Sequence, residues 1–169
     1  MNNIHIKQAP VLWATGKPFD AGRIIFEGLP TESRPKWASR ILKFLLRRYR
    51  IESPQFDYVL KMVDNKDLWS TGHQAFCNLR DTTLRLDEAG QKREFSEEES
   101  LLIAILAIAE LVCKVTYNAT SPIDEFDEDS GWWIVHCLRG FVDYAVENKE
   151  EGNESFSHDA WIAISAPLD

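Results

Sequence analysis

The amino-acid sequence predicts a mainly α, single-domain bundle of about six helices around two highly apolar central helices, with short extended N- and C-terminal segments. Apolar residues recur at the period of an α-helix through most of the chain. Capping residues and prolines stand where several of these stretches begin, and glycines stand where some of them end. Two stretches, residues 97–117 and 132–146, are apolar around almost their whole circumference, which is typical of helices at the centre of a fold.

The length of the chain fits one domain that spans residues 1–169. Hydrophobic residues make up 44% of the chain, and six Trp and nine Phe supply large apolar groups for a core. A chain of this size buries about 70% of its accessible surface on folding. The composition therefore argues against global disorder.

In the first half, the chain to about residue 16 is expected to be irregular, with a short edge strand at Ile4 and Ile6. Ser33 as N-cap and Pro35 in the first turn predict the start of a long helix. Ser53, which a proline follows, predicts the start of another. The helices expected in this half cover residues 19–27, 34–50, 54–63 and 71–90.

Ser96 and Glu99 form the strongest local signal in the chain, because their spacing is that of a capping box. The helix that begins there is expected to run to about Tyr117. Its only polar stripe is formed by Glu110 and Lys114, which are spaced i, i+4 in the favourable order.

A second apolar helix is expected from Trp132 to Val146. Gly140 within it costs about 1 kcal/mol relative to alanine, which predicts the close approach of another helix. The polar residues 147–157 predict a flexible loop. The apolar residues 158–169 predict a docked tail, either a short helix or a strand.

The formal net charge of −8 is divided unevenly along the chain. Residues 1–90 carry 14 Lys+Arg against 10 Asp+Glu, a balance of +4, and residues 91–169 carry 5 against 17, a balance of −12. The acidic total disfavours general nucleic-acid binding without excluding it. The two halves either pair with each other or present two faces to different partners.

Cysteine usage predicts a reducing, cytoplasmic compartment with free thiols, since Cys77, Cys113 and Cys137 form an odd set without a CxxC pair. The first residues lack the pattern of a signal peptide. An uninterrupted apolar run from Leu101 ends at Ala109, whereas a membrane span needs about 20 apolar residues. We therefore expect a buried core helix and no membrane partner.

A dense acidic run is the first candidate binding site, and its members are Asp124, Glu125, Asp127, Glu128 and Asp129. An EF-hand loop that starts at Glu125 would need Gly at Ser130 and Glu at His136, so that calcium template fails. The run is expected to bind a protein partner with a basic surface, and no metal is expected there.

A row of cations on the helix at 34–50 is the second candidate, and its members are Lys36, Arg40, Lys43, Arg47 and Arg50. Of these, Arg40, Lys43 and Arg47 are the binding residues that we single out. Such a face binds a nucleic-acid backbone, an acidic partner or the acidic half of the same chain, or it is simply solvated.

Histidine and cysteine residues suggest a third type of site. His73 and Cys77 are spaced i, i+4, and His136 precedes Cys137. A zinc site or a Cys–His nucleophile would draw on these residues, although neighbours on a helix point about 100° apart. The nucleotide-binding patterns GxGxxG and GxxxxGK[ST] are absent from the sequence, and we expect no cofactor.

These observations favour a non-catalytic cytoplasmic interaction module that acts through its acidic surface, such as an inhibitor or immunity-type protein. A small helical metal-dependent or Cys/His enzyme is one alternative, and nucleic-acid binding through the basic face at 36–50 is another. Of the adjacent Trp132 and Trp133, one must point outward, where it would line a groove or a subunit interface. A homodimer is also considered, because two strongly apolar helices can leave a face uncovered.

Overall fold

The computed structural model describes residues 7–90, 94–120, 130–150 and 152–168. Within these ranges the chain forms eight α-helices, three short 3-10 helices and no strand, so the prediction of a mainly α protein is confirmed. The α-helices are α2 (Ala9–Ala14), α3 (Pro18–Gly28), α4 (Arg34–Tyr49), α5 (Pro54–Asp64), α6 (Gly72–Gly90), α7 (Glu97–Asn118), α8 (Trp133–Glu147) and α9 (Asn153–Ser165). The 3-10 helices are η1 (Thr31–Ser33), η2 (Lys66–Thr71) and η3 (Ser130–Trp132).

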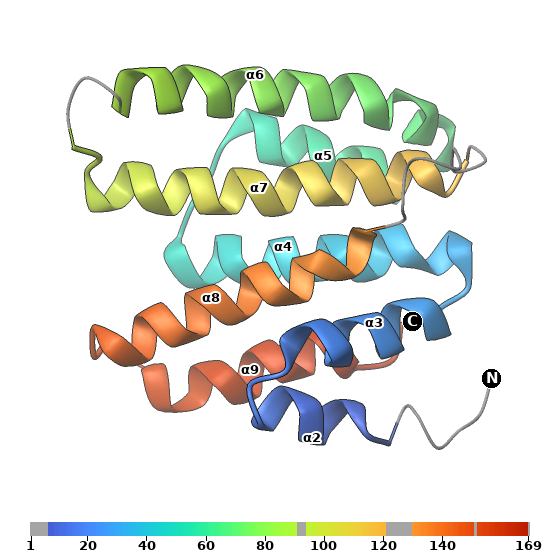
Figure 1. The fold of residues 1–169 in the computed structure, drawn as a ribbon. Coiled ribbons are helices and arrows are strands. Elements are labelled where there is room, and N and C mark those ends of the chain that lie inside the picture. The colour runs from blue at the N-terminus through green and yellow to red at the C-terminus, as the bar shows by residue number, and fades with distance from the viewer. Residues whose placement is uncertain (1–6, 91–93, 121–129, 151, 169) are drawn as a thin grey trace.

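The long helix α7 packs against α4, α5, α6 and α8. Figure 1 shows α7 between α6 and α8, with α5 partly behind α7 and α4 running behind α8. The remaining helices α2, α3 and α9 lie on the far side of α8 from α6.

Local capping explains why two of the predicted helices begin where they do. The Ser96 hydroxyl accepts from the backbone N–H of Glu99 at 3.2 Å, and the Glu99 carboxylate accepts from the Ser96 N–H at 3.0 Å, so the capping box is confirmed. The Ser53 hydroxyl accepts from the backbone N–H of Gln55 at the start of α5. Ser33 stands at the N-cap position of α4, but its side chain caps no backbone N–H.

The hydrophobic core draws on all eight of the described α-helices. Its largest fully buried side chains include Trp37, Phe26, Phe56 and Phe156. The Trp37 indole N–H donates to the Ile164 carbonyl at 2.8 Å, which satisfies a buried donor and ties α4 to α9.

Both ends of the described chain are more helical than the sequence predicts. Helix α2 lies where irregular chain was expected, while the edge strand predicted at Ile4 and Ile6 lies outside the described residues. The predicted loop at 147–157 is too long, because α9 begins at Asn153. The tail predicted at 158–169 continues this helix to Ser165 and is therefore not extended.

Helix α9 docks through a narrow apolar stripe, which explains why its polar first turn resembles a loop. Phe156 is fully buried, and the Arg48 guanidinium lies 3.9 Å above its ring centroid. Ala160 and Ile164 continue the stripe at i+4 and i+8 and are also buried.

The predicted close approach at Gly140 is wrong, since a Cβ added there would have no neighbour within 4 Å. The close approach in this region occurs instead at Gly22 of α3. A Cβ at Gly22 would lie 2.7 Å from the Val135 Cβ and 2.9 Å from the Trp132 carbonyl oxygen. The helix crossing therefore depends on a glycine in the partner helix of α8, not in α8 itself.

Helix α7 is long and apolar enough to cross a membrane by length and composition alone, with a mean hydropathy of 1.9 in its most apolar window. Half of that window is buried inside the fold. Core helices of globular proteins pass the same test, so this one helix is weak evidence for a membrane location.

Candidate functional site

The acidic candidate residues lie outside the described residues, since the structure does not describe 121–129. Asp124, Glu125, Asp127, Glu128 and Asp129 therefore remain a prediction from the sequence. In the sequence this acidic run ends immediately before η3, which leads into α8.

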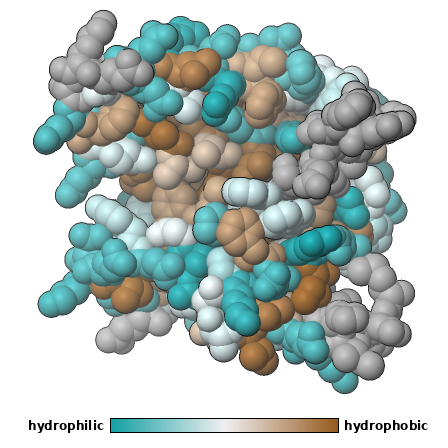
Figure 2. All heavy atoms as spheres, in the orientation of Figure 1, coloured by the Kyte–Doolittle hydropathy of each residue, from teal (hydrophilic) through white to brown (hydrophobic). Residues whose placement is uncertain are grey.

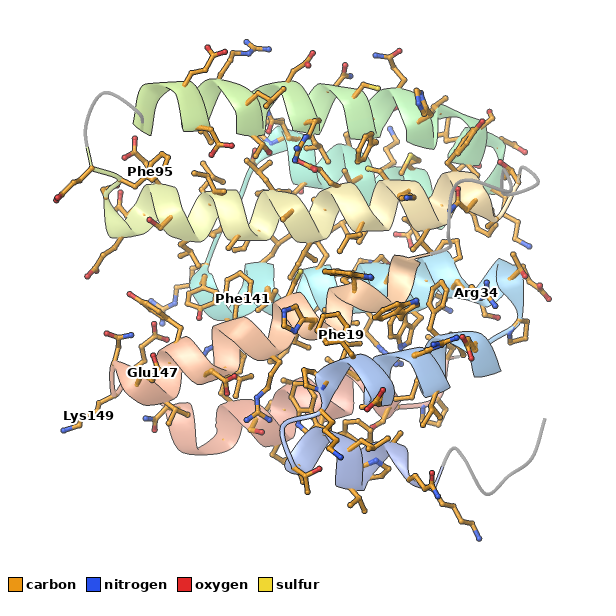
Figure 3. The ribbon with its side chains drawn as sticks, viewed as in Figure 1. Phe19, Arg34, Phe95, Phe141, Glu147 and Lys149 are labelled. Atoms are coloured by element: carbon orange, nitrogen blue, oxygen red, sulfur yellow. The ribbon has the colours of Figure 1, made fainter. Side chains whose placement is uncertain are left out.

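Four aromatic side chains gather where α8 begins, and we call Phe19, Trp132, Trp133 and His136 the aromatic cluster. The Phe19 ring stacks on the His136 ring with centroids 4.1 Å apart and an interplanar angle of 21°. The same ring meets Trp133 edge-on at 5.0 Å and Trp132 at 5.5 Å. Figure 3 shows Phe19 between α3 and α8.

The crossing of α3 over α8 positions this cluster. Gly22 follows Phe19 by about one helical turn and, because it has no side chain, lets α3 approach Val135 and the Trp132 carbonyl. This contact places Phe19 against His136, which lies one residue beyond Val135 on α8. The cluster is thus held by backbone packing between two helices.

The outer part of the aromatic cluster is open to solvent. Trp133 is 44% exposed and His136 is exposed, whereas Trp132 is half-buried. The prediction that one of the two tryptophans points outward is therefore confirmed. Exposed indole faces attract the guanidinium and ammonium groups of a partner, and Trp is enriched among the residues that dominate interface energies.

Arg40 on the basic face contacts the end of α9. Its Nε donates to the Ala163 carbonyl at 2.7 Å, and its two terminal nitrogens donate to the carbonyls of Ile164 at 3.2 Å and Pro167 at 3.0 Å. These contacts satisfy carbonyls that the last turn of a helix leaves without partners. Arg40 therefore has a role inside the fold.

The other two predicted residues of the basic face are placed differently. Lys43 Nζ lies 3.4 Å from the Asp64 carboxylate at the end of α5, so its partner is in the basic half of the chain and not in the acidic half. Arg47 is exposed. The three cations thus do not form one uniform row of solvent-facing charges.

The His and Cys residues are divided between two places. His73 Nδ1 and Cys77 Sγ lie 3.9 Å apart on α6, whereas His136 stacks on Phe19 between α3 and α8. Within the described part of the chain, no group of three or more His, Cys, Asp or Glu could hold a metal ion.

Burial disfavours the thiolate form of the two cysteines in the apolar helices. Burial, and secondarily the nearby Glu110 carboxylate, raise the pKa of the Cys113 thiol to about 12. Burial also raises the pKa of the Cys137 thiol. Nucleophilic cysteines instead have a lowered pKa, so these two thiols match structural cysteines.

Glu110 is buried, although the sequence predicted a polar stripe that it shares with Lys114. Its side chain lies under α6, where one carboxylate oxygen accepts from the Thr83 hydroxyl at 2.7 Å. The other oxygen lies 3.5 Å from an Arg80 nitrogen. This carboxylate therefore links α6 to α7.

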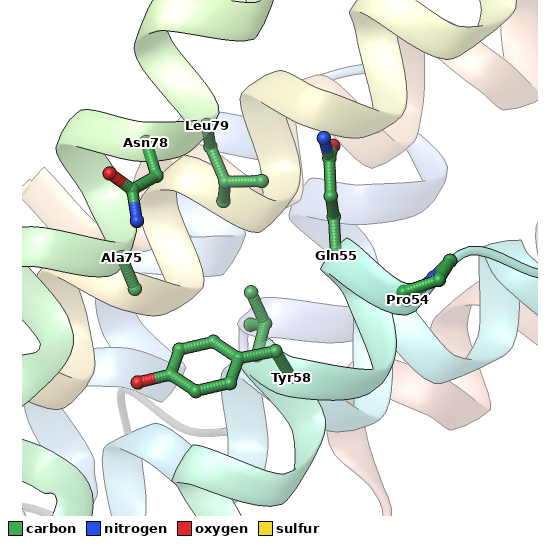
Figure 4. A pocket seen from close by; sticks show the side chains of 7 residues that line it. Pro54, Gln55, Tyr58, Ala75, Asn78 and Leu79 are labelled. Atoms are coloured by element: carbon green, nitrogen blue, oxygen red, sulfur yellow. The ribbon is translucent and has the colours of Figure 1, made fainter.

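A shallow groove between α5 and α6 is a feature that sequence reasoning missed. Its volume is about 250 Å³, below the roughly 300–1,000 Å³ usual for small-molecule sites. Figure 4 shows Tyr58 and Asn78 at this groove. It is lined by Pro54, Gln55, Tyr58, Val59, Ala75, Asn78 and Leu79. The sequence does not predict this groove, because it forms only where residues of α5 and α6 come together in the fold.

The aromatic cluster combines exposed aromatic rings with the close packing of α3 against α8 at Gly22. Its connection to the acidic run is through the sequence, since Trp133 follows Asp129 by four residues. Comparisons of the chain with protein-family models, with curated proteins and with solved structures find no match.

Proposed function

We propose that this protein is a non-catalytic interaction module that binds a protein partner with a basic surface. The binding surface combines the acidic run at 124–129 with the exposed Trp133 of the aromatic cluster. An inhibitor or immunity-type protein for a cationic toxin or nuclease would work through such a surface. We place its action in the cytoplasm, where the three free cysteines stay reduced.

The exposure of Trp133 beside Phe19 and His136 is the observation that carries this proposal. A tryptophan that is 44% exposed is available to stack on the planar guanidinium of an arginine. Carboxylates close to it in sequence add attraction to the same cation and accelerate encounter with a positively charged surface. Aromatic and acidic groups together thus favour an arginine-rich partner.

The two alternative functions receive less support. An enzyme that used Cys137 as its nucleophile would work against the raised pKa of that thiol, so among the predicted residues only the pair of His73 and Cys77, whose Nδ1 and Sγ lie 3.9 Å apart, is left for this alternative. Nucleic-acid binding through 36–50 would rely on Arg40, whose guanidinium already donates to three carbonyls of the C-terminal segment.

The test is the affinity of the full chain for an arginine-rich synthetic peptide, measured by calorimetry at low and high salt. Replacing Asp124, Asp127 and Asp129 together with Asn is expected to weaken binding at low salt and to flatten its salt dependence, because the carboxylates supply the attraction. The matched control replaces three exposed aspartates elsewhere, Asp81, Asp87 and Asp159, with Asn.

The aromatic contribution is tested separately by Trp133→Ala. We expect this variant to lose affinity for the arginine-rich peptide while retaining the salt dependence of the wild type. Equal affinity of the wild type, the Asp124/Asp127/Asp129 variant and the control variant would refute the proposed function. Equal weakening by the control would also refute it, since net charge alone would then explain binding.

A further inference from the structure

The outer side of α8 carries two large exposed side chains with a glycine between them. Trp133 is 44% exposed, Tyr144 is 48% exposed, and Gly140 is also exposed. The three residues are spaced i, i+7 and i+11, so they lie within about 40° of one another around the helix. We call Trp133, Gly140 and Tyr144 the α8 face.

Gly140 leaves an open notch in the α8 face. A Cβ at Gly140 would meet no atom of the described residues within 4 Å, so their packing does not account for a glycine in the middle of α8. Glycine costs a helix about 1 kcal/mol relative to alanine. At Gly22 the close packing of α3 against α8 offsets this cost, whereas at Gly140 the space that the missing side chain leaves is open to solvent. That space is available to another molecule.

The notch has the width of an α-helix. Trp133 and Tyr144 are 11 residues apart, which is about 16 Å along α8. An α-helix with its side chains is about 10–12 Å across, so one fits crosswise between the two aromatic rings. The closest approach falls at Gly140, because the distance between packed helices depends on the side chains at their contact. Figure 2 shows hydrophobic and weakly polar side chains across the middle of the molecule, where Figure 1 places α8.

The charged groups beside the notch are carboxylates. Asp143 and Glu147 are exposed and follow Gly140 by three and seven residues, which places both within about 60° of it around the helix. Arg139 is half-buried, and its guanidinium binds Asp143 at 2.7 Å and a backbone carbonyl of α2 at 3.0 Å. The exposed residues of α8 therefore include two carboxylates and no lysine or arginine. Figure 3 shows Glu147 in the last turn of α8 and Lys149 beyond it.

We infer that the α8 face is the docking site for a basic α-helix of the protein partner, which crosses α8 at Gly140 between Trp133 and Tyr144. This inference rests on the proposed function, and it adds the shape of the element that the partner supplies. Arginines of that helix stack on the two aromatic rings and pair with the carboxylates of Asp143 and Glu147. A second copy of this chain fits less well, because it would bring its own Asp143 within one helical turn of the crossing point.

The first test measures, by calorimetry, the affinity of the full chain for two arginine-rich synthetic peptides of equal length and charge. One peptide is held helical by a side-chain crosslink, and the other carries a central proline that breaks the helix. We expect the helical peptide to bind at least about tenfold more tightly, because its helix is formed before binding. Equal affinities, or tighter binding of the proline peptide, would overturn the inference and leave the proposed function in place. Binding of neither peptide would refute the proposed function as well.

Gly140→Gln tests the crossing point by filling the notch with an uncharged side chain. We expect its affinity for the helical peptide to fall at least about tenfold, because the two helices can no longer approach closely. The matched control is Ser70→Gln, since Ser70 is a small exposed residue of η2, which packs against α5, α6 and α7. An unchanged affinity in Gly140→Gln, or an equal loss in the control, would overturn the crossing point.

Tyr144 and Tyr58 provide a second matched pair, since they are 48% and 45% exposed on different helices. Tyr144→Ala removes one side of the notch and should weaken binding of the helical peptide at least about threefold. Tyr58→Ala alters the groove between α5 and α6 and should leave this affinity unchanged. A loss in Tyr58→Ala without a loss in Tyr144→Ala would overturn the inference, because it would place the peptide in that groove. Circular dichroism of each variant establishes that it is folded before its affinity is interpreted.

Sedimentation equilibrium without peptide tests a second copy as the occupant of the α8 face. We expect the wild type and Gly140→Gln to have the same mass at every concentration. A dimer that Gly140→Gln dissociates would overturn the inference, since a second copy would then cover this face.

Discussion

Two glycines in neighbouring helices allow a direct test of how α3 and α8 pack. Gly22 and Gly140 both lie inside helices and neither has a positive φ, so the backbone accepts alanine at both positions. Alanine favours the helix over glycine by about 1 kcal/mol at each position. The two substitutions differ in what the added methyl group meets.

At Gly140 the methyl group meets nothing within 4 Å, so only the gain in helix propensity remains. We expect Gly140→Ala to raise the free energy of unfolding by about 1 kcal/mol, which shifts Tm upward by about 2–4 °C in a chain of this size. At Gly22 the methyl group would lie 2.7 Å from a side-chain carbon of Val135 and 2.9 Å from a backbone oxygen. Overpacking of this kind costs about 1–3 kcal/mol, and the backbone oxygen of Trp132 cannot move aside as a flexible side chain could. Because the gain in helix propensity of about 1 kcal/mol offsets part of this cost, Gly22→Ala should lower the free energy of unfolding by up to about 2 kcal/mol.

The assay is urea unfolding followed by far-UV circular dichroism, at one protein concentration for all three proteins. The m-value should be the same for each, so that a shift in midpoint measures a change in stability. The order Gly140→Ala, wild type, Gly22→Ala is the expected ranking. Destabilisation by Gly140→Ala, or stabilisation by Gly22→Ala, would refute the assignment of the close contact to Gly22.

Four further substitutions test contacts inside the fold. Arg40→Ala removes three hydrogen bonds to the C-terminal segment and should lower the free energy of urea unfolding by about 2–3 kcal/mol. Lys43→Ala removes one exposed ion pair and should lower it by less than about 1 kcal/mol. Equal losses of stability in the two variants would contradict the role of Arg40 inside the fold. Thr83→Val removes the hydroxyl that donates to buried Glu110 and should cost about 1–3 kcal/mol in thermal unfolding, and a neutral effect would show that this bond is not formed. The pKa of Cys113 is raised by burial to about 12, from 9.0. The stability that the buried, protonated thiol contributes is therefore complete below about pH 9. It is lost as the pH rises toward 12, because the thiol of the unfolded chain gives up its proton first. Relative to Cys113→Ala, the wild type should lose up to about 1.4 kcal/mol per pH unit in urea unfolding above about pH 9, and a constant difference would argue against burial of this thiol.

Helices whose boundaries depend on local signals could be predicted from the sequence. Ser96 and Glu99 cap α7 because both hydrogen bonds join residues three apart, and this spacing is visible in one dimension. The start of α5 after Ser53 is predicted for the same reason. Periodicity places the fully buried Phe56 and Val59 on the inner face of that helix, where the structure has them.

Features that depend on which helices meet could not be predicted. Gly140 interrupts an apolar helix, which predicts a close contact there, yet a sequence does not show which of two crossing helices supplies the glycine at their contact. Gly22 does so here. Similarly, Glu110 looks like a solvent-facing residue until α6 is placed above it, with Thr83 as its donor. Arg40 is another example, since its carbonyl partners, in the last turn of α9 and at Pro167, are more than 120 residues away.

The candidate site was predicted only in part. The outward orientation of one of Trp132 and Trp133 follows from helix geometry alone, because adjacent residues point about 100° apart. The presence of Phe19 in the aromatic cluster could not be predicted from the sequence. Phe19 lies on α3 and reaches His136 only because the two helices cross closely at Gly22.

The attachment of α9 has a consequence for the order in which the chain folds. Trp37 and Arg40 of α4 hold the Ile164 carbonyl, 124 to 127 residues away, so the contact closes a very long loop. During synthesis α4 must wait for the last part of the chain before this side of it is covered. The contacts of Trp37 with Ile164 and of Phe44 with Phe156 are thus completed late, when α9 docks, and chaperone binding to the nascent chain should concentrate on α4 until then. Sequence order, and not only packing, sets when this protein acquires its stability.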